Sequence, residues 1–132
     1  MTHPIPRADI QISILGAEDA DALLPIYNEA LAPEERKPDA IIRQSLTRPD
    51  YLTLGAWAEN GGLLGFASLY KSSAYPFNLL EYLATDHEAR GQGIGAKLVQ
   101  AALSATPNTP LLIEVDAIPP SDPANAMSRR RQ

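Results

Sequence analysis

Hydrophobic and polar residues change their spacing several times along the chain, and each change predicts a new element. Residues 10–14 alternate between isoleucine and polar side chains, which is typical of a strand. Over residues 20–31 the apolar positions recur at helical spacing behind two acidic residues, which suit the first turn of a helix. A second, shorter helix is predicted to begin at Asp39.

The middle of the chain is rich in apolar residues that favour strands. Three such runs, at residues 51–59, 63–70 and 77–85, predict three consecutive strands. Asn60-Gly61 stands between the first two runs. This dipeptide predicts a tight hairpin turn in which both residues have positive φ.

The last part of the chain is predicted to form a helix over 93–105, a strand over 111–115 and a terminal helix over 122–132. The order is then β-α-α-β-β-β-α-β-α, with antiparallel pairing early and one β-α-β crossover late. Such an order indicates an α+β fold, in which a mixed, mostly antiparallel sheet lies between flanking helices. The 132 residues fit one domain, spanning residues 1–132.

Composition narrows the class of protein. Hydrophobic residues make up 45% of the chain, enough for a packed core, and the absence of cysteine excludes disulfides and cysteine nucleophiles. The net charge of −5 disfavours a nucleic-acid partner. The chain shows no apolar run of signal-peptide or membrane-spanning length, so we expect a cytoplasmic protein that does not associate with membranes.

The most informative segment is rich in glycine and lies where a loop is predicted to become a helix: Arg90-Gly91-Gln92-Gly93-Ile94-Gly95. Glycines let the backbone turn tightly and approach a ligand. The N–H groups at the start of a helix, together with the helix dipole, attract an anion. Arg90 and Lys97 add positive charge near the two ends, so the segment predicts a phosphate site.

Two other interpretations of this segment compete with a coenzyme site. Gly91-x-Gly93-x-x-Ala96 fits the G-x-G-x-x-G/A fingerprint of dinucleotide-binding folds, and Glu114 lies about 20 residues further on. In those folds, however, the first glycine follows its strand almost directly and opens a parallel βαβ unit. Here a loop separates the predicted strand from Gly91, and a predicted β-hairpin comes before that strand. In the second interpretation, the glycines only allow the helix to pack closely on a strand. The positively charged residues at both ends of the segment favour a ligand site instead.

The segment resembles the coenzyme-binding motif of the GNAT superfamily of N-acetyltransferases, because Arg90-x-x-Gly93-x-Gly95 matches [R/Q]-x-x-G-x-[G/A]. The strand predicted before the motif and the order of elements also resemble the family layout. The resemblance implies a three-layer GNAT-like fold, acetyl-CoA as co-substrate and no metal. It implies that backbone groups of Leu83 and Thr85 bind the pantetheine and that the N–H groups of residues 90–96 hold the pyrophosphate. The implied coenzyme-binding residues are Leu83, Ala84, Thr85, Arg90, Gly91, Gln92, Gly93, Ile94, Gly95, Ala96 and Lys97.

The same resemblance implies direct transfer of acetyl from sulfur to an amine of a small molecule or a protein. Candidate general bases are Glu81 and Glu114, each on a predicted strand, although either would also serve as a solvated or ion-paired residue. Strand alternation predicts that Glu81 shares a face with Leu79 and Leu83. Glu34 and Glu35, in a charged loop, are candidates for attracting a cationic acceptor.

The end of the chain departs from the family pattern. Many relatives have a tyrosine general acid on the helix after the fifth strand, and the predicted helix over 122–132 contains no tyrosine. The family also adds two further strands. The sequence therefore predicts a C-terminally truncated form whose open strand edge favours self-association, including a homodimer. An alternative function is a non-catalytic module that binds acyl-CoA.

Overall fold

The computed structural model describes residues 10–71 and 73–113 of the chain. In chain order, the α-helices and strands of this part are β1 (Gln11–Ile14), α1 (Ala20–Ala30), α2 (Asp39–Ser45), β2 (Tyr51–Trp57), β3 (Leu63–Lys71), β4 (Asn78–Thr85), α3 (Ile94–Ala105) and β5 (Leu111–Ile113). These positions confirm the predicted order of elements as far as the fifth strand. The predicted boundaries that fall within the described residues agree with the observed ones to within two residues. The predicted end of the fifth strand, at residue 115, lies outside the described residues.

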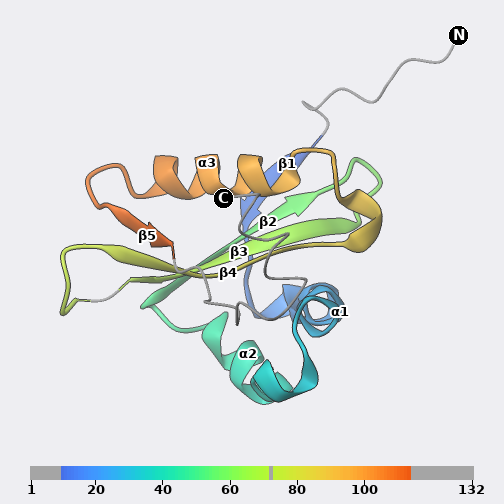
Figure 1. Cartoon of the computed structure of the whole chain (residues 1–132), viewed down its shortest axis with the longest axis horizontal. Coiled ribbons are helices and arrows are strands. Elements are labelled where there is room, and N and C mark those ends of the chain that lie inside the picture. Colours follow the sequence, from blue (N-terminus) through green and yellow to red (C-terminus); the bar gives the residue numbers. More distant parts are fainter. Residues whose placement is uncertain (1–9, 72, 114–132) are drawn as a thin grey trace, which may run out of the picture.

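The strands form one sheet in the order β1-β2-β3-β4-β5. The first four strands pair antiparallel to their neighbours, and β5 pairs parallel to β4. Helix α3 makes the connection between β4 and β5, as Figure 1 shows. The predicted mixed, mostly antiparallel sheet is therefore confirmed.

Helices cover both faces of the sheet, which gives three layers (Figure 1). Helix α3 lies on one face, and α1 and α2 lie on the other. A cluster of buried apolar side chains under α3 contains Leu69 and Leu98, and a second cluster under α1 contains Tyr27 and Phe66. Since β3 contributes to both clusters, burial of its two faces holds the layers together.

Strand β4 contains a β-bulge at Glu81. On the neighbouring strand, Ser68 pairs with Tyr82 and Leu69 pairs with Leu80, so Glu81 is an extra residue in this register. Leu80 belongs to the cluster under α3, whereas Glu81 and Tyr82 both line a cavity on the α1 and α2 side. A bulge of this kind re-aims side chains and is common beside functional sites. Here it places two consecutive residues on the same face.

The hairpin between β2 and β3 differs from the predicted turn. Gly61 has a φ of +95°, but Asn60 does not have positive φ. The N–H of Gly61 donates to the carbonyl of Ala58, and the N–H of Ala58 donates to the carbonyl of Gly62. The side chain of Asn60 accepts a hydrogen bond from the N–H of Gly62 at 3.0 Å. The prediction of a two-residue turn was therefore wrong, because the asparagine side chain stabilises a longer connection.

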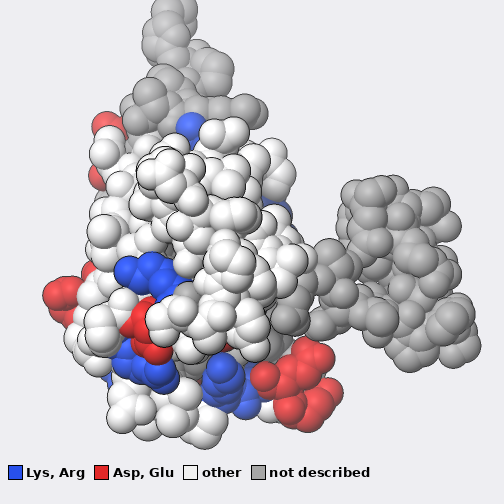
Figure 2. Space-filling view, turned by 90° about the vertical axis from the view of Figure 1, so that its left-hand side faces the viewer, with Lys and Arg blue, Asp and Glu red and all other residues white. Residues whose placement is uncertain are grey.

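Glu114 and the predicted terminal helix over 122–132 lie outside the described residues. Within residues 10–71 and 73–113, no helix is long and apolar enough to cross a membrane. On the face that Figure 2 shows, positive and negative side chains of the described part lie interspersed, without a continuous basic patch.

Candidate functional site

The glycine-rich segment forms a turn that leads into α3. Gly91 and Gly93 have φ angles of +87° and +76°, in the left-handed region that favours glycine. Gly93 immediately precedes the first turn of α3, and no side chain caps this end of the helix. The first-turn N–H groups of α3 are therefore available to a ligand, and their partial positive charge attracts an anion.

The space beside this turn suits a phosphate group. A Cβ atom on Gly91 would meet nothing within 4 Å, and one on Gly95 would meet Leu83 Cδ2 at 3.8 Å. An open groove of about 330 Å³ runs from the end of β4 to the start of α3. The groove is lined by residues 83–85, 89–91 and 93–95. The chemistry of its glycine turn and helix start suits an anionic group such as a pyrophosphate. Coenzyme binding at these residues stays a prediction.

Three of the predicted coenzyme residues lie outside this groove. Ala96 and Lys97 line a neighbouring hollow of about 410 Å³, which Gly93 and Gln100 also border. Gln92 is exposed and lines neither hollow. The structure therefore divides the predicted set between two adjoining surfaces at the start of α3.

Arg90, the first residue of the motif, is paired with a side chain of α1. Its Nη2 atom lies 3.7 Å from Oε1 of Glu29, and Nδ1 of His87 lies 2.8 Å from Oε2 of the same carboxylate. Glu29, Asp86 and His87 offer ligand atoms within 4.8 Å of one another, which is a spacing that metal sites use. These side chains are partly or fully exposed, and the guanidinium of Arg90 adds positive charge, so ion pairing accounts for the group.

A second candidate site lies on the other face of β4, between the sheet, α2 and the loop before α2. It is a cavity of about 170 Å³. Its floor is apolar and includes Leu23, Ile42 and Phe66. Side chains that can form hydrogen bonds or carry charge also line it: Lys37, Gln44, Ser45, Arg48, Tyr51, Thr53, Ser68, Glu81 and Tyr82.

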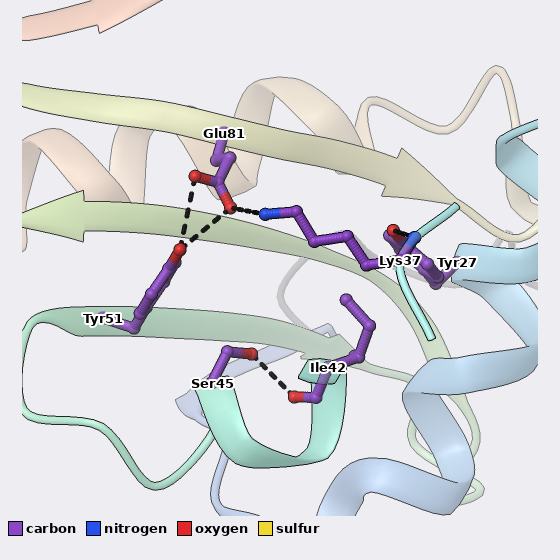
Figure 3. Close-up of polar contacts among 6 residues, drawn as sticks. All are labelled: Tyr27, Lys37, Ile42, Ser45, Tyr51 and Glu81. Carbon is purple, nitrogen blue, oxygen red and sulfur yellow. Dashed lines mark hydrogen bonds and ion pairs between the residues drawn. The ribbon is translucent and has the colours of Figure 1, made fainter. Parts of the chain in front are cut away.

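Glu81 is the acidic residue at the centre of the polar contacts in this cavity (Figure 3). Its side chain is 22% exposed. The hydroxyl of Tyr51 donates a hydrogen bond to Oε1 of Glu81 at 3.2 Å, and Nζ of Lys37 lies 3.5 Å from the same oxygen. The fold thus brings together β2, β4 and the loop before α2 around one carboxylate.

Two tyrosines of the cavity are held in their protonated form. Burial raises the pKa of Tyr51 to about 12, and the negative charge of Glu81 adds to this shift. Burial also raises the pKa of Tyr82, and the hydroxyl of Tyr27 contributes further. At neutral pH, Tyr51 therefore acts as a hydrogen-bond donor to Glu81.

A sequence profile of the Acetyltransferase (GNAT) family matches residues 20–130. The chain belongs to the GNAT family. The match extends from α1 through the glycine turn and beyond the described residues. Members of this family transfer acetyl groups from acetyl-CoA to amines, so the chain is an acetyltransferase domain. No curated protein matches the chain significantly.

Solved structures of GNAT enzymes share the fold. An aminoglycoside acetyltransferase from an uncultured soil metagenomic sample is 18% identical, with a TM-score of 0.66; the match covers 95% of this chain and 87% of that one. A ribosomal-protein-alanine N-acetyltransferase from Brucella melitensis biovar Abortus 2308 is 20% identical, with a TM-score of 0.65 and coverage of 92% and 89%. A GCN5-related N-acetyltransferase from Kribbella flavida is 21% identical, with a TM-score of 0.66 and coverage of 79% and 70%. These likenesses confirm the predicted GNAT fold.

The bulge corrects one expectation about the catalytic side of this GNAT domain. Strand alternation predicted that Glu81 and Leu83 share a face, but Leu83 lines the coenzyme groove and Glu81 lines the cavity. The bulge makes Glu81 share its face with Tyr82 instead. As a result, Glu81 is separated from the coenzyme groove by the backbone of β4, which is a suitable place for a group that acts on the acceptor.

The two predicted acceptor-side residues are not part of the cavity around Glu81. Glu34 and Glu35 belong to a short 3-10 turn, Pro33–Glu35, where both are exposed, and neither lines the cavity. Their role at the acceptor side stays a prediction. Glu114, the second candidate base, lies outside the described residues.

Sequence reasoning missed the two residues that contact the carboxylate of Glu81. Tyr51 was part of an apolar strand and Lys37 was part of a charged break, so neither had a signal of its own. The sequence did contain a signal of the bulge. Leu79 and Leu80 are adjacent apolar residues just before Glu81, and this pair interrupts the strict alternation of a regular strand. Tyr82, which lines the same cavity, packs edge-on against Tyr27, with ring centroids 5.2 Å apart.

Proposed function

We propose that this GNAT domain transfers an acetyl group from acetyl-CoA to a primary amine, with Glu81 as the general base. The observation that carries the proposal is the course of β4. Leu83, Ala84 and Thr85 line the groove beside the glycine turn, while Glu81, just before them, faces the cavity on the other side. Strand β4 therefore contributes residues to both sites. At the bulge, the residues of the two sites are separated by only a few positions in the sequence.

The protein's part in this reaction is to hold two substrates and to move one proton. Acetyl-CoA supplies an activated acetyl group. The first-turn N–H groups of α3 and the guanidinium of Arg90 would hold its pyrophosphate. Glu81 would accept the proton that the attacking ammonium must lose, and the protonated hydroxyl of Tyr51 would keep the carboxylate in place. Positioning two reactants in this way can supply a large part of a rate enhancement.

The end of the cavity at Glu81 and Tyr82 suits an acceptor that enters as a cation, although Lys37 and Arg48 also line the cavity. Glu81 offers a negative charge, and the ring of Tyr82 offers an aromatic face, to which ammonium groups are attracted. Two structural neighbours are, by name, acetyltransferases of aminoglycosides and of a ribosomal-protein alanine, and both acceptors are amines. The proposed acceptor is accordingly a primary amine of a small molecule or a protein. The exposed Glu34 and Glu35 would attract it toward the cavity.

Thiol release from acetyl-CoA with a panel of primary amines tests the proposal, beside a calorimetric titration of the same protein with CoA. Amine-dependent release that falls in Glu81→Gln, with CoA affinity retained, is the expected result. CoA binding without release for any amine would assign the alternative function, a non-catalytic acyl-CoA-binding module. Absence of CoA binding would refute both functions.

A further inference from the structure

The loop before α2 places an amine of the protein itself in the acceptor cavity. Nζ of Lys37 lies 3.5 Å from Oε1 of Glu81, the oxygen that also accepts the hydrogen bond of Tyr51. The same nitrogen lies 5.7 Å from the centre of the Tyr82 ring. Figure 3 shows the contact of Lys37 with the Glu81 carboxylate. With the Tyr82 ring as its second neighbour, Lys37 already makes the two contacts, with a carboxylate and with an aromatic face, that an incoming ammonium would make.

The backbone of Lys37 is anchored, so this position is set by the fold. Its N–H donates a hydrogen bond of 2.9 Å to the hydroxyl oxygen of Tyr27, whose side chain is fully buried under α1. Beside it, Nε of Arg36 donates to the carbonyl of Leu31 at 2.8 Å, which closes the loop back onto the end of α1. The side chain of Lys37 therefore starts from a fixed point and extends along the cavity toward Glu81.

We propose that Lys37 is an internal acceptor, and that the domain acetylates Nζ of Lys37 with acetyl-CoA. This proposal rests on the proposed function. Glu81 takes one proton from the Lys37 ammonium, and the freed amine attacks the thioester carbon. A C–N bond forms and the C–S bond breaks. The nitrogen loses its second proton, and the leaving thiolate takes up one proton to give free CoA. No oxidant or metal is required.

Tethering makes this reaction competitive with an external amine. A group that is held beside its partner reacts as if it were present at very high concentration, whereas an external amine must first bind. Acetylation would remove the positive charge of Lys37 and end its ion pair with Glu81. The acetylated domain would then hold the carboxylate free of an internal cation.

The test is acetylation of the purified full chain by acetyl-CoA, followed by intact mass measurement and peptide mapping over time. We expect a gain of one acetyl group that maps to Lys37, at least about tenfold faster than at the exposed Lys71, because only Lys37 lies beside the base. Lys71 reports the background rate of chemical acetylation. The gain should be absent in Lys37→Arg and slow in Glu81→Gln, and its rate constant should not depend on protein concentration.

The outcomes separate this inference from the proposed function. Acetylation of external amines with Lys37 unmodified would overturn the inference and leave the proposed function standing. Equal acetylation of Lys37 and Lys71, or no effect of Glu81→Gln on Lys37, would show chemical acetylation and would also overturn it. Failure of the protein to bind CoA would refute both the inference about Lys37 and the proposed function.

A second measurement needs no acetyl-CoA. Binding of n-butylamine, a probe for an alkylammonium, is followed by NMR through the ring signals of Tyr51 and Tyr82. Lys37→Gln clears the internal cation, so it should bind the probe several-fold more tightly than the unchanged protein. Arg43→Gln is the matched control, because it removes an exposed cation that pairs with Asp21 and does not line the cavity. Equal or weaker binding in Lys37→Gln would overturn the assignment of Lys37 to the acceptor position.

Discussion

The two faces of β4 carry sites that are built in different ways. The proposed coenzyme groove is made largely of backbone: two glycines with positive φ, the uncapped start of α3, and residues 83–85 at the end of the strand. The proposed acceptor cavity is made of side chains that come from separate segments, among them Lys37, Tyr51 and Glu81. One site is continuous in sequence and the other is assembled by folding.

This difference bears on how each site can change. A groove that binds through N–H groups depends on the backbone path, so it responds to glycine replacements and tolerates many side-chain changes elsewhere. A cavity of separate side chains can change its acceptor by single substitutions while the coenzyme groove stays as it is. The largest experimental effects should therefore follow from changes that separate coenzyme binding from turnover.

Glu81→Gln should give the largest difference between the effect on acetyl transfer and the effect on CoA binding. If Glu81 is the base, the rate of acetyl transfer falls by roughly 10²–10⁴-fold, while CoA affinity stays within a factor of about two. The acidic limb of the pH–rate profile should flatten as well. Glu59→Gln, on the exposed β2–β3 turn, is the control and should keep full rate. A full rate in Glu81→Gln would assign the base elsewhere.

Gly95→Glu should break the coenzyme face instead. The added Cβ meets Leu83 at an ordinary contact distance of 3.8 Å, so the fold should tolerate it, and the new carboxylate repels the pyrophosphate. CoA affinity should fall by about 100-fold or more, since like charges in contact cost several kcal/mol. Calorimetry with CoA measures the loss, and circular dichroism checks the fold.

Two companion variants sharpen this measurement. Gly95→Ala adds the Cβ without the charge and should retain most of the affinity. Gly93→Val is less informative, because Gly93 has a φ of +76° and valine would strain the turn itself. Unchanged CoA affinity in Gly95→Glu would refute the assignment of the pyrophosphate site to the start of α3.

Arg90→Ala should have a smaller effect on the same face. Its side chain is 58% exposed and already pairs with Glu29, so the backbone donors are expected to dominate. CoA binding should weaken by roughly 1–3 kcal/mol, which is typical of one hydrogen bond to a charged group. Arg43→Ala removes an exposed ion pair outside the groove and should leave CoA binding unchanged. A loss as large as that of Gly95→Glu would mean that the guanidinium, rather than the backbone, holds the phosphate.

The smallest expected effect concerns the pH dependence of stability. The pKa of Tyr51 is about 12 in the folded protein against an ordinary value of 10.0. Folding therefore favours the protonated hydroxyl, and this contribution is complete below pH 10 and is lost as pH rises through 12. In urea denaturation, the free energy of unfolding should fall more steeply over this range in the unchanged protein than in Tyr51→Phe. The difference should be below about 1 kcal/mol, because the group is partly solvated.

Tyr75→Phe provides the comparison for that measurement. Tyr75 is 61% exposed and stacks on Phe77 in the β3–β4 connection. Its replacement should leave the steep fall above pH 10 in place. Identical pH profiles for Tyr51→Phe and the unchanged protein would show that the contact between Tyr51 and Glu81 does not persist in solution.

The contrast between the two faces also explains what the sequence could predict. The glycine turn was predictable because its chemistry lies in consecutive residues, and the order of elements followed from clear apolar runs with strong breaks. The partners of Glu81 were not predictable, because Tyr51 and Lys37 lie far from it in the chain and meet it only through sheet pairing and the Tyr27 anchor. The bulge in β4 was missed because one extra residue changes which face of the sheet the side chains occupy, while the run of hydrophobic residues stays the same.

The bulge in β4 also has a consequence for reading relatives of this chain. Leu80 and Tyr82 already face opposite layers and pair with consecutive residues of β3, so removing the codon for Glu81 would leave a regular strand with its cores intact. Such a deletion would spare the fold and the coenzyme groove and would abolish only the proposed base. A one-residue gap at this point in an alignment would therefore mark a relative that has kept the GNAT fold and lost the proposed base.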